Sequence, residues 1–188
     1  MTYDTSKIGA CLAWAGEDFV FTYGDDSVIK FSKFDLITSR EKAQKRFIAD
    51  FGRAKQYFGR YVLDTEMAVS PSIFHIAKIQ RRIIEGRPLH MRDMQVETVR
   101  LQFKEILASF DAISSQNVVI DLIGLKGVFF DGFSNIFITP TQDLIIIDVT
   151  LLGINRYPWP LRPLMYVPLI VFRAAQEYRL KRFRPAVS

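Results

Sequence analysis

Cysteine and histidine are scarce in this chain of 188 residues. The single cysteine, Cys11, excludes an intrachain disulfide and a cysteine-rich metal site. With only His75 and His90, a histidine-based zinc centre is not expected either. Disulfide-stabilised scaffolds and zinc sites of these kinds are therefore set aside.

Long apolar runs are also missing. No run reaches the length of a membrane span, and the N-terminus lacks the basic-then-apolar layout of a signal peptide. We therefore expect a reducing, cytoplasmic compartment, with delivery into a host cell as an effector left open. The net charge of +5 suits an anionic ligand or surface. It does not give the dense basic face of a dedicated nucleic-acid binder, so no nucleic-acid partner is expected.

Apolar and aromatic side chains are plentiful, with sixteen Phe, seven Tyr and two Trp. They suffice to bury a core in one domain or one small bilobal unit. Gly86 and Pro88 interrupt regular structure in the connector Ile83–Leu89, which is the expected boundary. We predict an α+β fold, with a sheet and one long helix in residues 1–85 and a mainly helical part in residues 86–188.

The first part is predicted to form a small sheet and a helix. Strands are expected over Ile8–Ala15, Phe19–Tyr23, Val28–Phe31, Tyr61–Val69 and Ile73–Ile79. A helix capped by Thr38 or Ser39 would end near Phe58, with an apolar face made of Phe47, Ile48, Phe51, Ala54 and Phe58. Lys30 lies inside an apolar strand. It is either a solvated alternate position or a phosphate-binding lysine on the inner face of the sheet.

The second part is predicted to begin with a helix over Met94–Ile113. It continues with a short strand Val118–Leu122, a hairpin of Ile136–Thr139 and Leu144–Ile147, an irregular segment Arg156–Pro168 and a basic helix Leu169–Arg184. The basic helix suits a weak contact with an anionic membrane or an acidic partner, although a solvated basic face gives the same pattern.

The hairpin carries the most informative pair of polar residues. Asn135 precedes its first strand, and Asp148 follows its second strand thirteen residues further on. Two oxygen-bearing side chains on facing backbone elements can hold a hard cation such as Mg²⁺, with waters and phosphate as the remaining ligands. An ordinary hairpin with an Asn turn and an Asp cap would show the same residues.

The order of these features resembles the protein-kinase-like superfamily, in particular its small atypical bacterial branch of lipopolysaccharide kinases and kinase-like effectors. Val28–Lys30 is similar to the third-strand lysine motif, and Ile83–Leu89 resembles the hinge. Asn135 and Asp148 are similar to the two metal-binding residues of kinases, and their spacing equals the usual one. The resemblance implies a minimal bilobal kinase-like fold, with an antiparallel sheet lobe and a reduced helical lobe.

The resemblance further implies ATP and Mg²⁺ as cofactors. Lys30 would hold the α- and β-phosphates, kept in place by Asp50 of the helix or, as a poorer substitute, by Glu41. Glu85 lies in the hinge-like segment, and Gly16 belongs to what is left of the glycine-rich loop that covers the nucleotide. The implied cofactor-binding residues are therefore spread over both parts of the chain.

The implied catalytic residues depart from the kinase pattern in one respect. Asn135 and Asp148 would bind the Mg²⁺ that neutralises charge on the transferred phosphoryl group. Phe130 occupies the usual position of the catalytic aspartate, five residues before the asparagine. Asp131 is one residue too close and Asp121 is too far along the chain to align, which leaves Asp131 as the candidate base.

Three functions are compatible with this sequence. The first is a minimal kinase that transfers the γ-phosphate of ATP to a hydroxyl of a protein or a small molecule. The second is a pseudokinase, a nucleotide- or partner-binding module without phosphoryl transfer. The third is an unrelated α+β domain whose matches to kinase motifs arose by chance.

Overall fold

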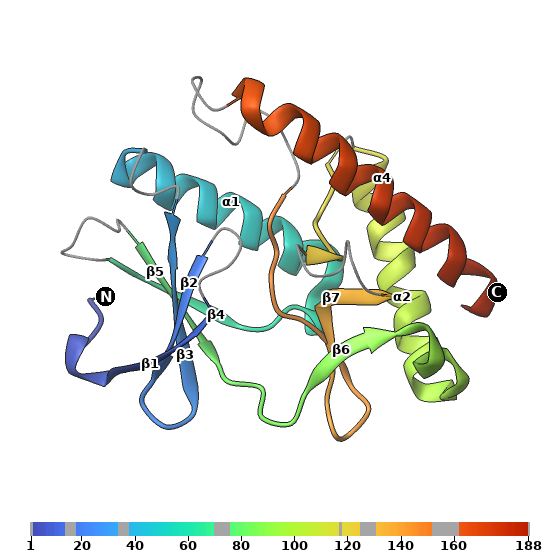
Figure 1. Ribbon diagram of the computed structural model, residues 1–188, viewed down its shortest axis with the longest axis horizontal. Helices are drawn as coiled ribbons and strands as arrows, with labels where there is room; N and C mark the ends of the chain where they lie inside the picture. Colours follow the sequence, from blue (N-terminus) through green and yellow to red (C-terminus); the bar gives the residue numbers. More distant parts are fainter. Residues whose placement is uncertain are drawn as a thin grey trace. The chain divides into compact units, whose positions relative to one another are not determined.

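The computed structural model describes residues 2–13, 18–33, 38–69, 76–116, 118–124, 131–151 and 162–187. It has an antiparallel sheet in its first part and three long helices among the described residues, so the predicted α+β class is confirmed (Figure 1). The chain divides into two compact units. Unit 1 is Met1–Ala49 with Leu63–Ile84, and unit 2 is Asp50–Val62 with Glu85–Ser188. Asp50–Val62, which we expected in the N-terminal part, is thus grouped with unit 2.

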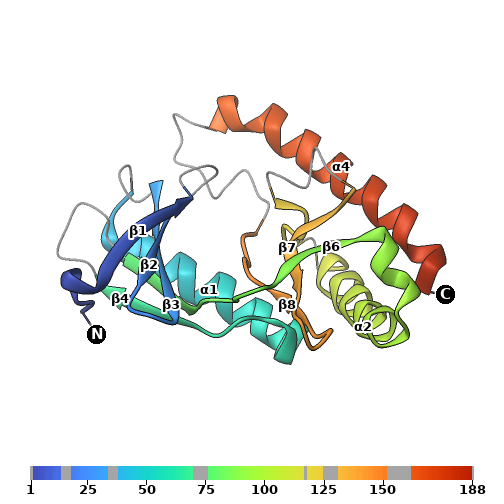
Figure 2. The same cartoon turned by 60° about the horizontal axis from the view of Figure 1, so that its bottom comes forward.

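Unit 1 is built on a five-stranded antiparallel sheet in the order β1-β2-β3-β5-β4 (Figure 2). Its strands are β1 (Ile8–Ala13), β2 (Asp18–Tyr23), β3 (Ser27–Ser32), β4 (Thr65–Val69) and β5 (Ile76–Arg81). The predicted hairpin of β2 and β3 is confirmed, and Gly24 supplies the left-handed residue of its turn at φ +61°. Strand β4 begins later than predicted because Gly59–Tyr61 forms a 3₁₀ turn first.

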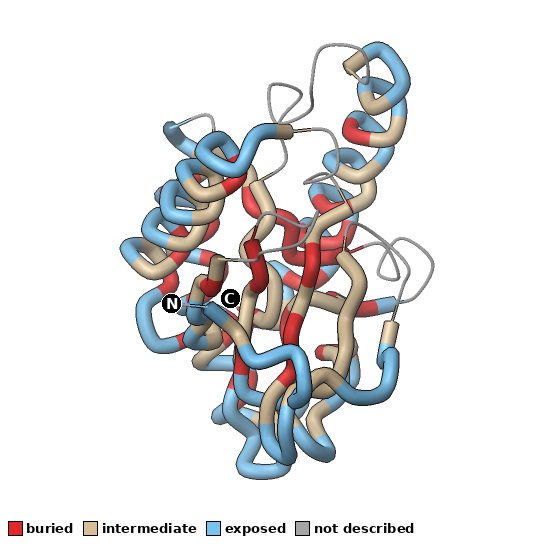
Figure 3. Tube along the Cα trace, turned by 90° about the vertical axis from the view of Figure 1, so that its left-hand side faces the viewer, coloured by how far each residue is buried: buried red, intermediate tan, exposed pale blue. Residues whose placement is uncertain are grey.

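Side chains alternate across this sheet. Ile29 and Phe31 of β3 are buried on one face, where they pack with Ala68 and Ala77. Buried positions (red in Figure 3) recur along the strands and helices, with exposed positions between them. The intervening β3 residue, Lys30, therefore lies on the opposite face of the sheet.

Helix α1 (Arg40–Phe58) matches the predicted helix. The Ser39 hydroxyl accepts a hydrogen bond from the Lys42 N–H at 3.4 Å, as expected of a cap. Ala54 and Phe58 are buried in unit 2, but Ile48 is 59% exposed, so its placement on the apolar face was wrong. Ile48 lies six residues before Ala54, which at 3.6 residues per turn rotates it about 240° away.

Unit 2 combines a three-stranded sheet with helices. In chain order it contains β6 (Arg87–His90), η4 (Met91–Gln95), α2 (Glu97–Ser114), β7 (Gly132–Ile138), β8 (Leu144–Ile146) and α4 (Arg162–Val187). The rings of Phe103, Phe133 and Phe183 are fully buried, with centroids 4.8–5.5 Å apart. This aromatic cluster joins α2, β7 and α4 in one core.

Three predictions for unit 2 are corrected. The connector Ile83–Leu89 contributes β6, an edge strand that tolerates Pro88 because its missing N–H removes no interior hydrogen bond. Val118–Leu122 forms no strand, only an isolated bridge between Ile120 and Leu151. Helix α4 already begins at Arg162, inside the segment predicted to be irregular. Pro163 lies in its first turn, where proline is well tolerated, whereas Pro168 and Pro185 lie inside the helix. None of the described helices has the length and apolar character that a transmembrane span requires.

Candidate functional site

The β7–β8 hairpin brings Asn135 and Asp148 to its open end. Ile136 pairs with Ile146, and the Ile147 N–H donates to the Asn135 carbonyl oxygen at 2.9 Å. Asp148 is therefore the first residue beyond the last hydrogen bond between the two chain segments. The predicted hairpin is confirmed, but Asn135 lies inside β7 and not in a preceding loop, because β7 already starts at Gly132.

The Asn135 side chain is oriented by a single hydrogen bond. Its Nδ2 donates to the Asp121 carbonyl oxygen at 2.9 Å, and no described residue donates to its Oδ1. Gly124 lies against this amide at φ +60°, and a Cβ atom there would come within 2.6 Å of Oδ1. Glycine adopts this left-handed backbone without strain and leaves space for the Asn135 amide oxygen. Within the described part of the chain, that oxygen therefore has no protein donor.

Asp121 is a site residue that sequence reasoning missed. It is only 8% exposed. Its N–H donates to the Thr150 carbonyl oxygen at 2.8 Å, and its Oδ1 accepts from the Gly124 N–H at 2.8 Å. Asp121 therefore joins β7 to the segment after β8. The pattern Asp121 to Gly124, an aspartate that caps its own turn, was the one local signal that could have indicated it.

A glutamine from α4 holds this segment from the other side. The Leu122 N–H donates to Gln176 Oε1 at 2.7 Å, and Gln176 Nε2 donates to the Ile120 carbonyl oxygen at 2.9 Å. Gln176 is 1% exposed. Its amide satisfies the Leu122 N–H and the Ile120 carbonyl oxygen, and β7 donates to the Leu122 carbonyl oxygen, so the backbone of this segment is paired although no regular strand forms.

Asp148 completes what we call the Asn135–Asp148 cluster, which consists of Asp121, Asn135, Asp148 and Thr150. Asp148 is half-buried, and its Oδ1 accepts a hydrogen bond from Thr150 Oγ1 at 3.0 Å. Within the described ranges, no three His, Cys, Asp or Glu side chains gather closely enough to hold a metal by themselves. Mg²⁺ commonly uses one or two protein oxygens and takes its other ligands from phosphate and water. Asn135 and Asp148 thus offer ligand types that a phosphate-bound Mg²⁺ takes, whereas the described residues hold no ligand set for a structural metal.

Asp131, the candidate base, lies immediately before β7 and forms ion pairs with arginines of α4. Arg182 donates to its two carboxylate oxygens at 3.0 and 3.4 Å. The Arg179 guanidinium lies 3.6 Å away and also donates to the Gly132 carbonyl oxygen. Phe130 is outside the described residues.

The same contacts change the interpretation of the basic helix. Besides Arg179 and Arg182, Arg184 forms hydrogen bonds with both carboxylate oxygens of Asp111. A substantial part of the positive charge on α4 is thus balanced by aspartates of unit 2. Less of it faces an external anionic surface than the sequence suggested.

Lys30 is the candidate phosphate ligand in unit 1. It is half-buried in β3, between Val20 of β2 and Lys78 of β5. Lys78 forms an ion pair with Asp18, and both of these side chains are largely buried. Two lysines therefore lie side by side on one face of the sheet, and one of them has its charge compensated by Asp18.

The remaining predicted nucleotide ligands are distributed as follows. Glu41 bonds Lys45 at 2.7 Å on the exposed surface of α1, as an i,i+4 pair. Asp50 is half-buried on the same helix. Gly16 lies outside the described residues. Glu41 therefore has a local partner on α1 that accounts for its position.

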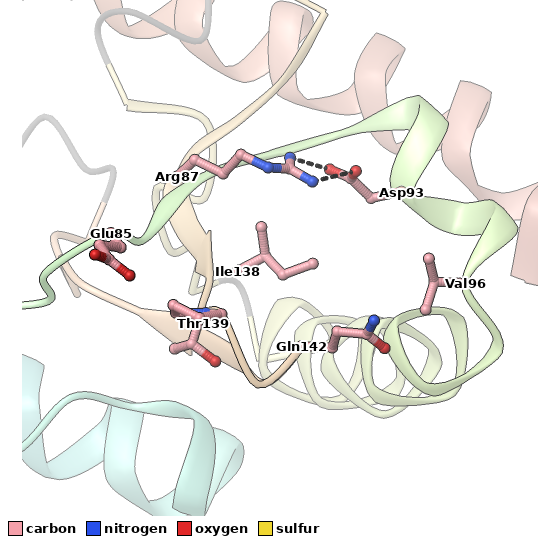
Figure 4. A pocket seen from close by; sticks show the side chains of 8 residues that line it. Glu85, Arg87, Asp93, Val96, Ile138, Thr139 and Gln142 are labelled. Atoms are coloured by element: carbon pink, nitrogen blue, oxygen red, sulfur yellow. Dashed lines mark hydrogen bonds and ion pairs between the residues drawn. The ribbon is translucent and has the colours of Figure 1, made fainter.

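Glu85 lines a pocket in unit 2 together with Arg87 and Asp93 (Figure 4). Arg87 donates two hydrogen bonds of 2.7 Å to the Asp93 carboxylate, which also accepts from the His90 N–H at 2.8 Å. Burial alone would raise the pKa of Asp93, but the hydrogen bonds from Arg87 and His90 hold it below its ordinary value. The carboxylate is therefore ionised and fixed.

This ion pair makes stability depend on pH. Because the pKa of Asp93 is lowered in the folded state, its stabilisation is complete above the unfolded pKa and is lost as the pH falls through the folded pKa. We expect the free energy of unfolding to decrease below about pH 4, and to decrease less in Asp93→Asn. Urea unfolding across this range measures the slope. An acid slope identical in the variant and the wild type would contradict the assignment.

Comparisons with known proteins give structural neighbours only. No family model matches the chain, and no curated protein matches its sequence. One similar solved structure is the aminoglycoside phosphotransferase APH(2")-IIIa in complex with GDP and kanamycin, with 15% identity, 54% of this chain covered and a TM-score of 0.37. The chain spans 35% of the length of that protein. Another is choline kinase LicA from Streptococcus pneumoniae, with 8% identity, 96% of this chain and 92% of that chain covered, and a TM-score of 0.40.

Proposed function

We propose that this chain is a minimal kinase-like phosphotransferase, which transfers the γ-phosphate of ATP to a hydroxyl of a protein or a small molecule. The observation that carries the proposal is the open end of the β7–β8 hairpin. There, Asn135 Oδ1 accepts no hydrogen bond from a described residue, and Asp148 is the residue after Ile147, whose N–H donates to the Asn135 carbonyl oxygen. Asn135 lies opposite Ile147, the residue before Asp148, and an amide oxygen and a carboxylate are ligand types that Mg²⁺ takes beside phosphates.

The residues have distinct tasks in this proposal. Asn135 and Asp148 would hold Mg²⁺, which supplies charge neutralisation at the transferred phosphoryl group. The Asp121 carbonyl oxygen holds the Asn135 amide, and Gln176 holds the backbone on both sides of Asp121. The amide oxygen then needs no reorientation when a nucleotide binds. Lys30 would hold the α- and β-phosphates, and Asp50 would position Lys30.

The ion pair of Asp131 favours a second candidate function. Both oxygens of this carboxylate are bonded by Arg182, and Arg179 lies close by. A base has to be within reach of the proton that it abstracts, and a carboxylate held by α4 is constrained in where it can reach. The alternative is therefore a pseudokinase that binds nucleotide without transferring phosphate.

A thermal-shift experiment tests the nucleotide site common to both functions. ATP with Mg²⁺, at a hundred-fold excess over Kd, is expected to raise Tm by about 5–11 °C, because ligand binding stabilises the native state by mass action. Mg²⁺ alone is expected to give no shift, since the described residues hold no three-carboxylate group. The same shift with ATP and EDTA would contradict a metal role, and no shift at millimolar ATP would contradict nucleotide binding altogether.

A further inference from the structure

A second site lies at the other end of the β7–β8 hairpin. A pocket of about 350 Å³ is lined by Glu85, Arg87, Asp93, Val96, Ile138, Thr139, Pro140 and Gln142 (Figure 4). Ile138 ends β7, three residues beyond Asn135, which corresponds to about 10 Å along a strand. The pocket is thus separate from the Asn135–Asp148 cluster, and all of its lining residues belong to unit 2.

Two residues of this pocket have an unusual backbone. Glu85 at φ 62° and Gln142 at φ 65° are the only non-glycine residues with a left-handed backbone in the described part of the chain. This conformation is unfavourable for a residue with a Cβ atom, and glycine would adopt it freely. Strained residues of this kind concentrate at ligand-binding sites. Gln142 belongs to the turn between β7 and β8, where a left-handed residue is common, so Glu85 is the residue of the two whose backbone no hairpin turn explains.

The polar groups of the pocket are unequally satisfied. Arg87 and Asp93 bond each other at two points and leave no net charge. The Glu85 carboxylate accepts no hydrogen bond and makes no ion pair with any described residue. Gln142 Oε1 accepts from Thr98, whereas its Nε2 has no acceptor among the residues that the structure describes. The pocket therefore presents one uncompensated negative charge and one amide donor.

Apolar surface lies between these two groups. Figure 4 shows Glu85 on one side of the pocket, Gln142 and Val96 on the other, and Ile138 between them. A ligand that uses both polar groups must therefore have an apolar stem that crosses Ile138. Glu85 is exposed in the free protein, and covering its carboxylate with an uncharged ligand would cost its hydration, so a cationic group is the end that suits Glu85.

We propose that this pocket binds a cationic ligand, a primary amine or a guanidinium group on an alkyl stem. The cation pairs with Glu85, the stem packs on Ile138 and Val96, and an acceptor oxygen of the ligand receives a hydrogen bond from Gln142 Nε2. A free alkylamine and a Lys or Arg side chain of a peptide share this chemistry. Binding here does not depend on the proposed phosphotransfer.

Isothermal titration calorimetry with three probes tests the proposal. N-acetyl-lysine-N-methylamide offers the ammonium, the stem and carbonyl oxygens, n-pentylamine offers the ammonium and stem alone, and N-acetyl-norleucine-N-methylamide lacks the ammonium. We expect the lysine derivative to bind at least about tenfold more tightly than the norleucine derivative, because the charge-assisted bond to Glu85 is lost in the latter. Equal binding of these two, or no binding of either amine at millimolar concentration, would overturn the proposal.

Variants assign the binding to this pocket and distinguish the two sources of the amine. Glu85→Gln is expected to lower amine affinity about tenfold, whereas Glu177→Gln, an exposed glutamate on α4, is expected to leave it unchanged. A preference for the lysine derivative over n-pentylamine that disappears in Gln142→Ala identifies a peptide ligand. Equal affinity for both probes identifies a small amine. An unchanged affinity in Glu85→Gln would overturn the proposal.

Replacing Glu85 with glycine should change amine affinity and thermal stability in opposite directions. Glu85→Gly removes the ligand contact but relieves the left-handed strain, so we expect weaker amine binding together with a Tm raised by about 2–4 °C. A residue with a purely structural role would not combine these two effects. A lowered Tm in both Glu85→Gly and Gln142→Gly would show that the side chains stabilise the fold, and would overturn the proposal.

Discussion

Replacing Asp148 with asparagine is expected to abolish phosphoryl transfer and to remove the Mg²⁺-dependent part of nucleotide binding. The substitution keeps the size of the side chain and its hydrogen bond with Thr150, but it removes the charge. Loss of one electrostatic contact at a transferring group typically costs about 10²–10³-fold in rate, and loss of the anionic metal ligand should cost at least that much. Transfer of radiolabelled phosphate from ATP, and the thermal shift with and without Mg²⁺, measure the two effects.

Two variants make this result interpretable. Asp25→Asn changes an exposed aspartate in the turn between β2 and β3 and is expected to retain full activity. Asp131→Ala is expected to be slower than the wild type but still active, because positioning and charge stabilisation supply most of the catalysis of phosphoryl transfer. Equal labelling in the wild type and Asp148→Asn would refute the assigned role. Nucleotide binding without any labelling by the wild type would identify the pseudokinase.

Replacing Gln176 with leucine is expected to lower the free energy of unfolding by about 2–5 kcal/mol. The variant leaves the Leu122 N–H and the Ile120 carbonyl without partners in a buried environment. Each unsatisfied buried group costs about 1–3 kcal/mol. Urea denaturation followed by circular dichroism measures the change directly.

The effect should extend to the candidate site. The backbone that Gln176 holds leads directly into Asp121, whose carbonyl oxygen orients Asn135. We therefore expect Gln176→Leu to weaken Mg²⁺-dependent nucleotide binding even at temperatures where it is folded. Gln56→Leu, on the exposed side of α1, is the matched control and should change stability by less than about 0.5 kcal/mol. Equal stability of the two variants would contradict the role of Gln176.

Local patterns predicted much of the fold. The β2–β3 hairpin, α1 with its Ser39 cap and the β7–β8 hairpin each follow from side-chain periodicity and turn residues within one short segment. The same local information placed Asn135 and Asp148 toward the open end of one hairpin, where Asn135 lies opposite Ile147. Pro88 was misleading, since only the position of β6 at a sheet edge makes a proline acceptable there.

The rest of the site depends on contacts that no short segment contains. Gln176 bonds backbone groups more than fifty residues earlier in the chain, and Arg182 reaches Asp131 across a similar separation. On an amphipathic helix, no sequence pattern distinguishes a glutamine or arginine that bonds a distant segment from one that faces solvent. The kinase-like spacing excludes Asp121 as the catalytic aspartate because it measures distance along the chain. The Asn135 amide nevertheless contacts Asp121 in the folded structure.

The position of α4 in the chain has a consequence for biosynthesis. Gln176 bonds the backbone at Leu122, Arg182 bonds the Asp131 carboxylate and Arg184 bonds the Asp111 carboxylate. All three partners emerge from the ribosome before α4. The sheet of unit 1, in contrast, is complete once β5 has been made. A nascent chain can therefore close unit 1 early, while the Asn135–Asp148 cluster waits for α4. During that interval the aromatic core around Phe133 lacks Phe183 and is exposed to chaperones and proteases.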